Sequence, residues 1–552
     1  MKAFLMYPDS DYDPQAPLPS QAGELTQDLG LDILFDSMAA GDTFLRDVAR
    51  QTVLHSLTEF ATIIYRQQIL TDALANFDMV RGLYALAVDA IEREKHVWGW
   101  MTTRYPNESL HRSVEVLAIF AELLGRLRRV ADEAASAFQS PGFRRFFAML
   151  RSELDDAYLD RVRDHLERLA FNGGVLMSAD LGEGNRGTRY ILRRPPDAQR
   201  GWLSRLQDWV SHLGEEPEQF YTYEVAERDE AGFNALSELK SEGIASVAVA
   251  LAQSTDHILS FFKLLRLELA FYVGCINLQE HLTRKGEPVC LPVPATEGET
   301  GLCCRGLYDA VLSLTIAERT VGNEISGTGK ALLLLTGANR GGKSTLLRAI
   351  GQAQLMMQCG MFVPAESFRG ELSSGIFTHF KREEDAEMKS GKLDEELARM
   401  STIVERLRPG CLVLLNESSA STNEREGSEI GRQIVKALLG AGMRAAYVTH
   451  MYDLAHSFYR EHLPNALFLR AERLQNGERT FRLTEGEPLS TSHGQDLYFR
   501  IFGGSAVLPS PEKKGARLPA DDEHKSGDQQ DRFDDGNENL LGQSVNDALS
   551  EE

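Results

Sequence analysis

The sequence contains few cysteines and no long apolar run, and both absences exclude classes of protein. Among 552 residues there are six cysteines, none in a Cys-x-x-Cys pair, so neither a disulfide framework nor a zinc ribbon is expected. No stretch reaches about 18 consecutive apolar residues, and the N-terminus soon turns acidic, which argues against a membrane span and a secretory signal. We therefore expect a reduced, cytoplasmic protein without a membrane partner.

Basic residues are also scarce relative to acidic ones. The chain has 59 Lys and Arg against 81 Asp and Glu, a net charge of -22. Such a protein would not coat nucleic acid indiscriminately, although it can still carry a local basic groove. Part of the acidic excess lies in residues 508–552, which hold few large apolar side chains before Leu540. This segment is expected to be a disordered acidic tail.

The hydrophobic pattern divides the rest of the chain into two differently organised parts. Residues 26–169 are poor in Gly and Pro and place apolar side chains three or four positions apart, which is typical of long amphipathic helices. The pattern returns over 231–291, after a Gly- and Pro-containing segment, 170–230, with two short strand-like runs. We interpret the helical stretches as a lever that carries 170–230 as a small insert, with 1–25 as an N-terminal extension.

Residues 292–507 have the pattern of a largely parallel sheet covered by helices. An amphipathic helix is expected at 344–358, and Asn-Gly within 475–478 predicts a β-hairpin. Apolar strands are expected at 331–336, 411–415 and 445–449. The expected fold class is therefore α plus α/β: a long helical lever with an insert, followed by an α/β domain and a disordered tail.

A phosphate-binding loop lies between the first of these strands and the helix. Residues 337–344 satisfy the pattern Gly-x-x-x-x-Gly-Lys-Ser/Thr in its strand–loop–helix context. Glycines let backbone N–H groups turn toward phosphate oxygens, and the helix N-terminus adds positive potential. Lys343 is expected to reach the β- and γ-phosphates of ATP, and the Ser344 hydroxyl to bind Mg²⁺. The candidate nucleotide-binding residues are Gly337, Ala338, Asn339, Arg340, Gly341, Gly342, Lys343, Ser344 and Thr345.

Polar residues follow the other two strands. Asn416 and Glu417 come directly after 411–415, and Glu417 is placed to orient or deprotonate an attacking water as a catalytic residue. Asn416 stands where an aspartate is usual, so it is expected to hold hydrated Mg²⁺ more weakly, through a water, which would slow hydrolysis. The third strand ends at Thr449-His450, and His450 could contact the γ-phosphate and respond to its presence.

These motifs occur in the order and spacing of the MutS-type mismatch-repair ATPases, which the chain resembles over roughly 300–500. The matching segments are GANRGGKST, GMFVPA (360–365), IFTHF (376–380), LVLLNE followed by SSASTNEREG, and VTHMYDL (448–454). Upstream, TIIYRQQIL (62–70) is similar to the family's Arg-Gln motif at the start of its lever domain. The order of lever, insert and lever is similar to the family's lever and clamp.

The resemblance implies a dimeric DNA-binding ATPase of repair or recombination. Asn339, Gly342, Lys343 and Ser344 would bind the triphosphate and Mg²⁺, Glu417 would be the catalytic carboxylate, and His450 would be the switch. Residues 361–364 would pack beside the site. Residues 418–427 would form the loop that crosses to the second subunit of a homodimer.

The sequence departs from the family pattern in four ways. Ala338 and Arg340 replace a Pro and a Met of the phosphate loop, and Asn416 replaces the aspartate that supports Mg²⁺. Residues 391–397 stand where the family has Ser-Thr-Phe-x-x-Glu-Met. The family's serine, which reaches the partner's nucleotide, is replaced here by Gly391 or, if the alignment slips by one residue, corresponds to Ser390. The chain begins at the lever and has no Phe-x-Glu wedge in a matching position, so mismatch reading is not expected.

The insert carries the best candidate for a DNA contact. Five arginines fall within 15 residues of it, among glycines and beside Tyr190: Arg186, Arg189, Arg193, Arg194 and Arg200. Such a cluster suits contacts to the DNA backbone without base readout, and a solvated basic loop is an equal alternative.

Two other functions stay open. In the first, the chain is an ATP-binding scaffold, because Asn416 and the altered 391–397 segment would leave ATP hardly hydrolysed. In the second, it is an unrelated P-loop enzyme such as a small-molecule kinase, against which stand the long lever and the absence of a recognisable acceptor site. The residue that stacks on adenine is not apparent, with Tyr308 a weak candidate.

Overall fold

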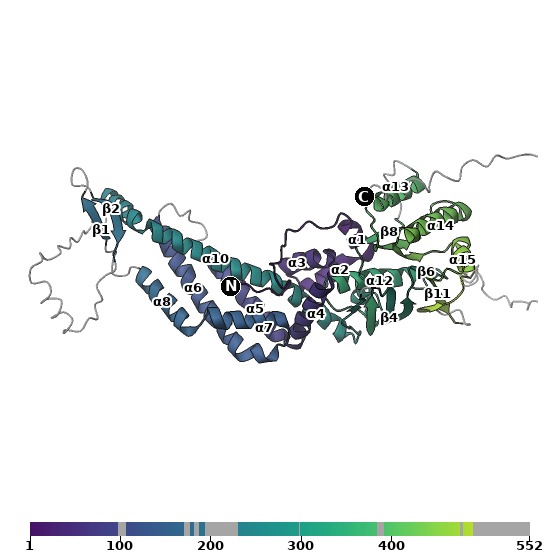
Figure 1. Ribbon diagram of the computed structural model, residues 1–552, viewed down its shortest axis with the longest axis horizontal. Coiled ribbons are helices and arrows are strands. Elements are labelled where there is room, and N and C mark those ends of the chain that lie inside the picture. Colours follow the sequence, from purple (N-terminus) through teal and green to yellow (C-terminus); the bar gives the residue numbers. More distant parts are fainter. Residues whose placement is uncertain are drawn as a thin grey trace, which may run out of the picture. The chain divides into compact units, whose positions relative to one another are not determined.

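Helices dominate the first half of the chain and strands the second in the computed structural model (Figure 1). The structure describes residues 1–97, 106–170, 177–181, 187–193, 230–296, 298–382, 391–474 and 479–489. The chain forms two compact units, one of Met1–Asp13 with Thr71–Val273 and one of Pro14–Leu70 with Gly274–Glu552. Helices α4 (Phe60–Ala75) and α10 (Glu230–Arg284) continue from one unit into the other.

Long helices build the first unit. They are α5 (Phe77–His96), α6 (Pro106–Ala134), α7 (Pro141–Glu153), α8 (Asp156–Leu169) and most of the 55-residue α10. Side-chain caps begin two of them, since Ser140 and Asp155 accept hydrogen bonds from backbone N–H groups of the first turn. The rings of Phe138, Phe143 and Phe147 pack together in the core, with centroids 4.5 to 5.9 Å apart. The predicted helical character is therefore confirmed for the described part of 26–169 and for 231–284, whereas residues 285–291 follow the end of α10 and are not helical.

A two-stranded hairpin lies in the predicted insert. Strand β1 (Met177–Leu181) pairs antiparallel with β2 (Gly187–Leu192), so both strand-like runs of 170–230 are confirmed. Arg193 follows β2, is exposed, and donates from Nε to Ser178 Oγ at 2.8 Å. The positions of Arg186, Arg194 and Arg200, and the side chain of Arg189, lie outside the described residues.

The second unit is built on a six-stranded sheet of order β12-β11-β6-β10-β9-β8. Its strands are β6 (Leu332–Thr336), β8 (Ile376–Phe380), β9 (Leu412–Asn416), β10 (Arg444–Val448), β11 (Ala466–Arg473) and β12 (Arg479–Glu485). All neighbours run parallel except β11 and β12, which form the predicted hairpin. The three predicted strands are confirmed to within one residue, and the turn at 475–478 lies outside the described residues.

Helices cover both faces of this sheet because its strands are apolar on both sides. Helix α12 (Lys343–Gln358) packs on one face, where Gly351 lies close to Leu414. The other face carries α13 (Lys392–Val404), α14 (Glu424–Gly440) and α15 (Tyr452–Arg460), as Figure 1 shows. Their apolar side chains Met400, Leu438 and Phe458 are fully buried with those of the strands.

A smaller sheet of order β3-β7-β4-β5 lies in the same unit. Its strands are β3 (Val293–Pro294), β4 (Gly301–Leu307), β5 (Asn323–Thr328) and β7 (Ser367–Gly370), and α11 (Ala310–Thr315) follows β4. Cys303 and Cys304 are neighbours on β4, so their side chains leave opposite faces of the strand. All six cysteines are free.

The helices α1 (Ala22–Leu29), α2 (Leu31–Ala39) and α3 (Thr43–Leu54) complete the second unit together with the first part of α4. The Arg-Gln motif lies in this part of α4. Arg66 is buried and donates to the carbonyl of Cys359, and Gln67 donates to the carbonyl of Pro292 at 2.9 Å. Arg66 therefore connects α4 to the residue that follows α12, and Gln67 connects it to the residue that precedes β3.

Within the described ranges, none of the helices combines the length and the apolar character that crossing a membrane requires.

Gly351 tests the packing of α12 on the sheet. A Cβ at this position would lie 2.7 Å from Leu414 Cδ1 and 2.8 Å from Leu29 Cδ2. We expect Gly351→Ala to lower the free energy of unfolding by about 1–3 kcal/mol, because the core is overpacked, and to lower Tm in a thermal melt. Gly23→Ala in α1 is the matched control, since nothing lies within 4 Å of its added Cβ, and it should be neutral or slightly stabilising. Equal effects of the two substitutions would contradict this packing.

Candidate nucleotide-binding site

Three loops meet at one edge of the large sheet because its strands run parallel. Strand β10 lies between β6 and β9, and Val448 pairs with Leu335 on one side and Asn416 on the other. The loop 337–342 follows β6, Glu417 follows β9, and His450 follows β10. The carboxyl edge of a parallel sheet is where ligands bind in open α/β folds. The structure thus brings together the three segments that the sequence singles out.

The loop 337–342 has a backbone that requires glycine. Gly337 and Gly342 have φ of 108° and 92°, in the left-handed region that side chains disfavour. A Cβ on Gly341 would lie 2.8 Å from the Cβ of Ala471 in β11, so this position has no room for a side chain. Gly342 immediately precedes α12, and the loop therefore ends at the N-terminus of a 16-residue helix.

The Lys343 ammonium is held inside this loop. It is buried and donates to the carbonyls of Gly337 at 2.7 Å and Ala338 at 3.0 Å. Burial lowers the pKa of Lys343, and the nearby negative charge of Glu417 opposes that shift. The site therefore contains a buried cation whose hydrogen bonds go to two backbone carbonyls of the same loop.

Ser344 and Asn416 meet although they are far apart in the sequence. The Ser344 hydroxyl donates to Asn416 Oδ1 at 2.9 Å. Both oxygens are of the kind that binds Mg²⁺, and Glu417 is the next residue after Asn416. Among the described residues no cluster of three or more His, Cys, Asp or Glu side chains could hold a metal ion. The Ser344 and Asn416 oxygens therefore fit an ion that is coordinated mainly by waters and by phosphate oxygens of the substrate. Mg²⁺ is usually bound in this way.

Glu417 projects from a strained backbone. Its φ is 53°, and its N–H donates to the carbonyl of Val448 at 2.9 Å. Its carboxylate is 29% exposed, and Oε1 lies 3.8 Å from Nδ1 of His450, an ion-pair distance rather than a hydrogen bond. The His450 ring lowers the pKa of the Glu417 carboxyl most, the charges of Lys343 and Lys381 add to this, and burial opposes it. The carboxylate is therefore ionised at neutral pH.

The other candidates in the loop are accessible. Asn339 and Arg340 are exposed, and Arg340 has a φ of 59°. Ala338 is half-buried, as is Thr345 in the first turn of α12.

Two expectations about the surroundings of the site are wrong. Residues 361–364 do not pack beside the phosphate loop, because they follow the far end of α12, about 24 Å along the helix from Lys343. Tyr308 cannot stack on a bound base, because its side chain is buried at 2% exposure. Its backbone N–H donates instead to the carbonyl of Pro364.

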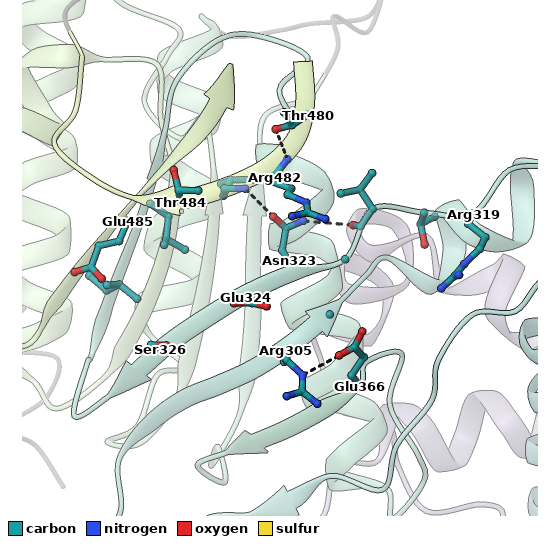
Figure 2. Close-up of a pocket in the computed structure, with 17 residues that line it drawn as sticks. Arg305, Arg319, Asn323, Glu324, Ser326, Glu366, Thr480, Arg482, Thr484 and Glu485 are labelled. Atoms are coloured by element: carbon teal, nitrogen blue, oxygen red, sulfur yellow. Dashed lines mark hydrogen bonds and ion pairs between the residues drawn. The ribbon is translucent and has the colours of Figure 1, made fainter. Parts of the chain in front are cut away.

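A cavity of about 800 Å³ lies between strands of the two sheets in the second unit (Figure 2). It is lined by β4, β5 and the segment before β5 on one side, and by β11 and β12 on the other. Asn323 joins the two sides, because its Oδ1 accepts from Leu483 N at 2.7 Å and its Nδ2 donates to the carbonyl of Phe481 at 3.4 Å. The same Phe481 carbonyl lies 3.1 Å from where a Cβ of Gly342 would be. One strand thus borders both the cavity and the loop.

The chain matches two family models that both belong to MutS-type proteins. Residues 58–285 match the MutS2 N-terminal domain, and residues 333–494 match MutS domain V. The first match contains the Arg-Gln motif and the helices α4 to α8 and α10, and the second contains all three loops of the site. The chain belongs to the MutS family.

Curated members of the MutS family are similar to parts of this chain. MutS protein homolog 4 of Mus musculus is 31% identical over 30% of the chain and 17% of its own length. DNA mismatch repair protein MutS of Chloroflexus aurantiacus is 27% identical over 45% of the chain and 28% of its own length. Endonuclease MutS2 of Lactiplantibacillus plantarum is 30% identical over 35% of the chain and 24% of its own length. The chain therefore spans less than a third of the length of each of these relatives.

Sequence reasoning missed the cavity of this MutS-family chain. Its lining comes from segments about 150 residues apart, including Arg319, Asn323 and Arg482, none of which belongs to a recognisable motif. No pattern in the sequence signals that these segments meet. Only the alternation of polar side chains in β12 is visible there, and it is common in any strand with one wet face.

Proposed function

We propose that this MutS-family chain binds and hydrolyses ATP at the carboxyl edge of its six-stranded sheet. The observation that carries the proposal is the meeting of Ser344 with Asn416 at 2.9 Å, beside Glu417 and His450. This places a phosphate loop, oxygen donors suited to Mg²⁺ and an ionised carboxylate within one site. Fold alone would not argue for hydrolysis, but this set of side chains does.

Each side chain then has a task that follows from its position. Lys343 and the N–H groups of 337–342 bind the β- and γ-phosphates. On binding, the Lys343 ammonium exchanges its hydrogen bonds to the Gly337 and Ala338 carbonyls for contacts with phosphate oxygens. Bound Mg²⁺ would be held by Ser344 and, through a water, by Asn416, and it supplies charge neutralisation on the phosphates. Glu417 orients the attacking water and accepts its proton at a carboxylate oxygen. His450, beside that carboxylate, contacts the γ-phosphate and responds to its loss.

The base end of the nucleotide is proposed to enter the cavity of Figure 2. Thr480 and Arg482 of β12 line the cavity, and the Phe481 carbonyl between them lies close to Gly342, so this strand links the cavity to the loop that would hold the phosphates. Val321 offers an exposed apolar surface at the cavity wall, and Asn323 and Arg482 offer polar groups. Such a mixture is typical of sites that bind a flat heterocycle and a ribose.

Lys343 and Glu417 are expected to fail in different ways. Lys343→Ala should abolish ATP binding or hydrolysis, because the cation that reaches the phosphates is lost. Glu417→Ala should keep ATP affinity while turnover falls on the order of a hundredfold or more, as for a positioned general base. Equilibrium binding of a fluorescent ATP analogue and steady-state phosphate release measure the two quantities. Unchanged turnover in Lys343→Ala, or lost binding in Glu417→Ala, would contradict these roles.

We further propose that the chain acts as a homodimeric clamp on DNA in repair or recombination, without mismatch reading. In this proposal 26–169 and 231–291 form the lever, 170–230 the clamp-like insert, and 292–507 the ATPase domain. The first part of the proposed lever, up to Leu70, belongs to the same compact unit as the ATPase domain. Segment 391–397 would face the partner's nucleotide, and 418–427 would form the loop that crosses to the second subunit. Supporting it are the match to the MutS2 N-terminal domain and relatives whose names include DNA mismatch repair.

The proposed DNA contact lies on the insert. Changing Arg186, Arg189, Arg193 and Arg194 to Ala together should weaken binding to all duplex sequences alike, because these residues would contact phosphates rather than bases. Each lost contact should reduce the slope of log affinity against log salt by roughly 0.9. Fluorescence anisotropy with perfect and mismatched duplexes over a salt series measures this, and ATP turnover without DNA is the control, expected to be unchanged.

Two results would contradict this contact surface. A marked preference for a mismatch would show that bases are read. Binding that is indifferent to the four substitutions would move the contact elsewhere, with the exposed arginines of α6, such as Arg126 and Arg129, as the next candidates.

One observation favours a second function, an ATP-binding scaffold. Asn416 offers a neutral oxygen where a carboxylate would hold Mg²⁺ more strongly, so ATP could fix the dimer while being hardly hydrolysed. Tight ATP binding without phosphate release would identify the scaffold. An unrelated kinase would instead consume ATP only in the presence of a small acceptor and would show no salt-dependent DNA binding.

A further inference from the structure

Residues 417–419 have a left-handed backbone conformation at two positions, and such a conformation needs stabilising contacts. Glu417 and Ser419 have φ of 53° and 64°, in a region that non-glycine residues seldom occupy. Ser418 between them is buried. Two such residues within three positions persist only where neighbouring groups hold them, and they often occur where a functional side chain must point in one direction.

Ser418 is held from both strands that flank β9. On the β8 side, its hydroxyl lies 2.7 Å from Nδ1 of His379 and 2.9 Å from the His379 carbonyl. On the β10 side, the Tyr447 hydroxyl donates to the Ser418 carbonyl at 2.6 Å. His379 and Tyr447 both pair in register with Leu415, so they stand level on either side of the strand that leads to Glu417.

The proton arrangement in this group is determined by its acceptors. His379 Nε2 lies 3.1 Å from the carbonyl of Glu396 in α13, which can only accept, so Nε2 carries the proton. Burial lowers the pKa of His379 to about 4, so the ring is neutral at neutral pH. Nδ1 is then an acceptor, as is the His379 carbonyl, and both face the single hydroxyl proton of Ser418. The ring is thus fixed at both nitrogens and cannot turn away from Ser418.

Close backbone packing restrains the far side of the loop. A Cβ on Gly427, in the first turns of α14, would lie 2.4 Å from the Ser419 carbonyl oxygen. Tyr447, His379, Ser418 and Ser419 are all nearly inaccessible to solvent. Ser418 and Ser419 are therefore enclosed by β8, β10 and α14, whereas the Glu417 side chain is partly exposed.

We propose that Ser418, His379 and Tyr447 are positioning residues that hold the Glu417 carboxylate in the orientation needed for ATP hydrolysis. The proposal rests on the proposed ATPase function. None of the three touches the nucleotide; each acts through the backbone on either side of Glu417. Their loss should therefore lower kcat and leave the affinity for ATP unchanged, because Lys343 and the loop 337–342 are independent of them.

The sharpest test removes a single hydroxyl. Tyr447→Phe keeps the buried ring but removes the hydrogen bond to the Ser418 carbonyl, and we expect kcat to fall about tenfold with KM and ATP affinity within twofold of wild type. Tyr272→Phe is the matched control. It removes a buried tyrosine hydroxyl that also donates to a backbone carbonyl, that of Leu5 in the first unit. This control should lose stability to a similar degree and keep wild-type turnover.

A second variant and a double-mutant cycle separate positioning from general destabilisation. Ser418→Ala removes both hydroxyl contacts with His379 and should lower kcat at least as much as Tyr447→Phe. In a Glu417→Gln background, Tyr447→Phe should have little further effect on single-turnover hydrolysis, because the group it positions is already disabled. Additive losses would show that Tyr447 acts elsewhere.

The outcomes distinguish this proposal from the one on which it rests. If the wild-type chain hydrolyses no ATP, the proposed function fails. If the wild-type chain hydrolyses ATP and Tyr447→Phe and Ser418→Ala match Tyr272→Phe in kcat, the ATPase stands and the positioning proposal is overturned.

Discussion

The parallel pairing of β10 between β6 and β9 is the constraint on which the site depends. Because the three strands run in the same direction and end at the same level, the residues that follow them must meet at one edge of the sheet. Ser344 and Asn416, 72 positions apart, are in hydrogen-bond contact for this reason. A register shift of β9 by one residue would exchange its two faces and remove Glu417 from this edge.

The charges at this edge stabilise one another. Lys343 loses solvation on burial, which lowers its pKa, and the Glu417 carboxylate counteracts that loss. Conversely, His450 and then the charge of Lys343 lower the pKa of Glu417. A lowered carboxyl pKa contributes stability above the pKa of the unfolded chain, and this contribution is lost as the pH falls through the folded value. The ionised state of Glu417 is therefore robust at neutral pH and weakens only under acidic conditions.

Much of the site follows from local sequence, and the remainder depends on contacts between distant segments. Gly337, Gly342 and Lys343 are predictable because a turn that exposes backbone N–H groups requires glycines at fixed spacing, between a strand and a helix. The antiparallel pairing of β11 with β12 is predictable from the Asn-Gly sequence between them. The cavity beside Asn323 and the support of Glu417 by Tyr447 are not, because no local pattern encodes which strands become neighbours.

The two wrong expectations fail because of where the fold places the residues. The resemblance implied that residues 361–364 pack beside the phosphate loop, but they follow the far end of a 16-residue helix. Tyr308 has the chemistry to stack on a base, but burial removes it from solvent. A motif or a residue type predicts a role only when the position of the residue in the fold is also known.

The most direct test of the account is phosphate release from ATP by the full chain over a range of Mg²⁺ concentrations, with Asn416→Asp measured in parallel. If β6, β9 and β10 end in a hydrolytic site, the wild-type chain releases phosphate in a Mg²⁺-dependent manner. Asn416→Asp then reaches its half-maximal rate at a lower Mg²⁺ concentration, because a carboxylate holds the hydrated ion more strongly than an amide does. Tight ATP binding with no phosphate release from either protein would contradict hydrolysis at this site.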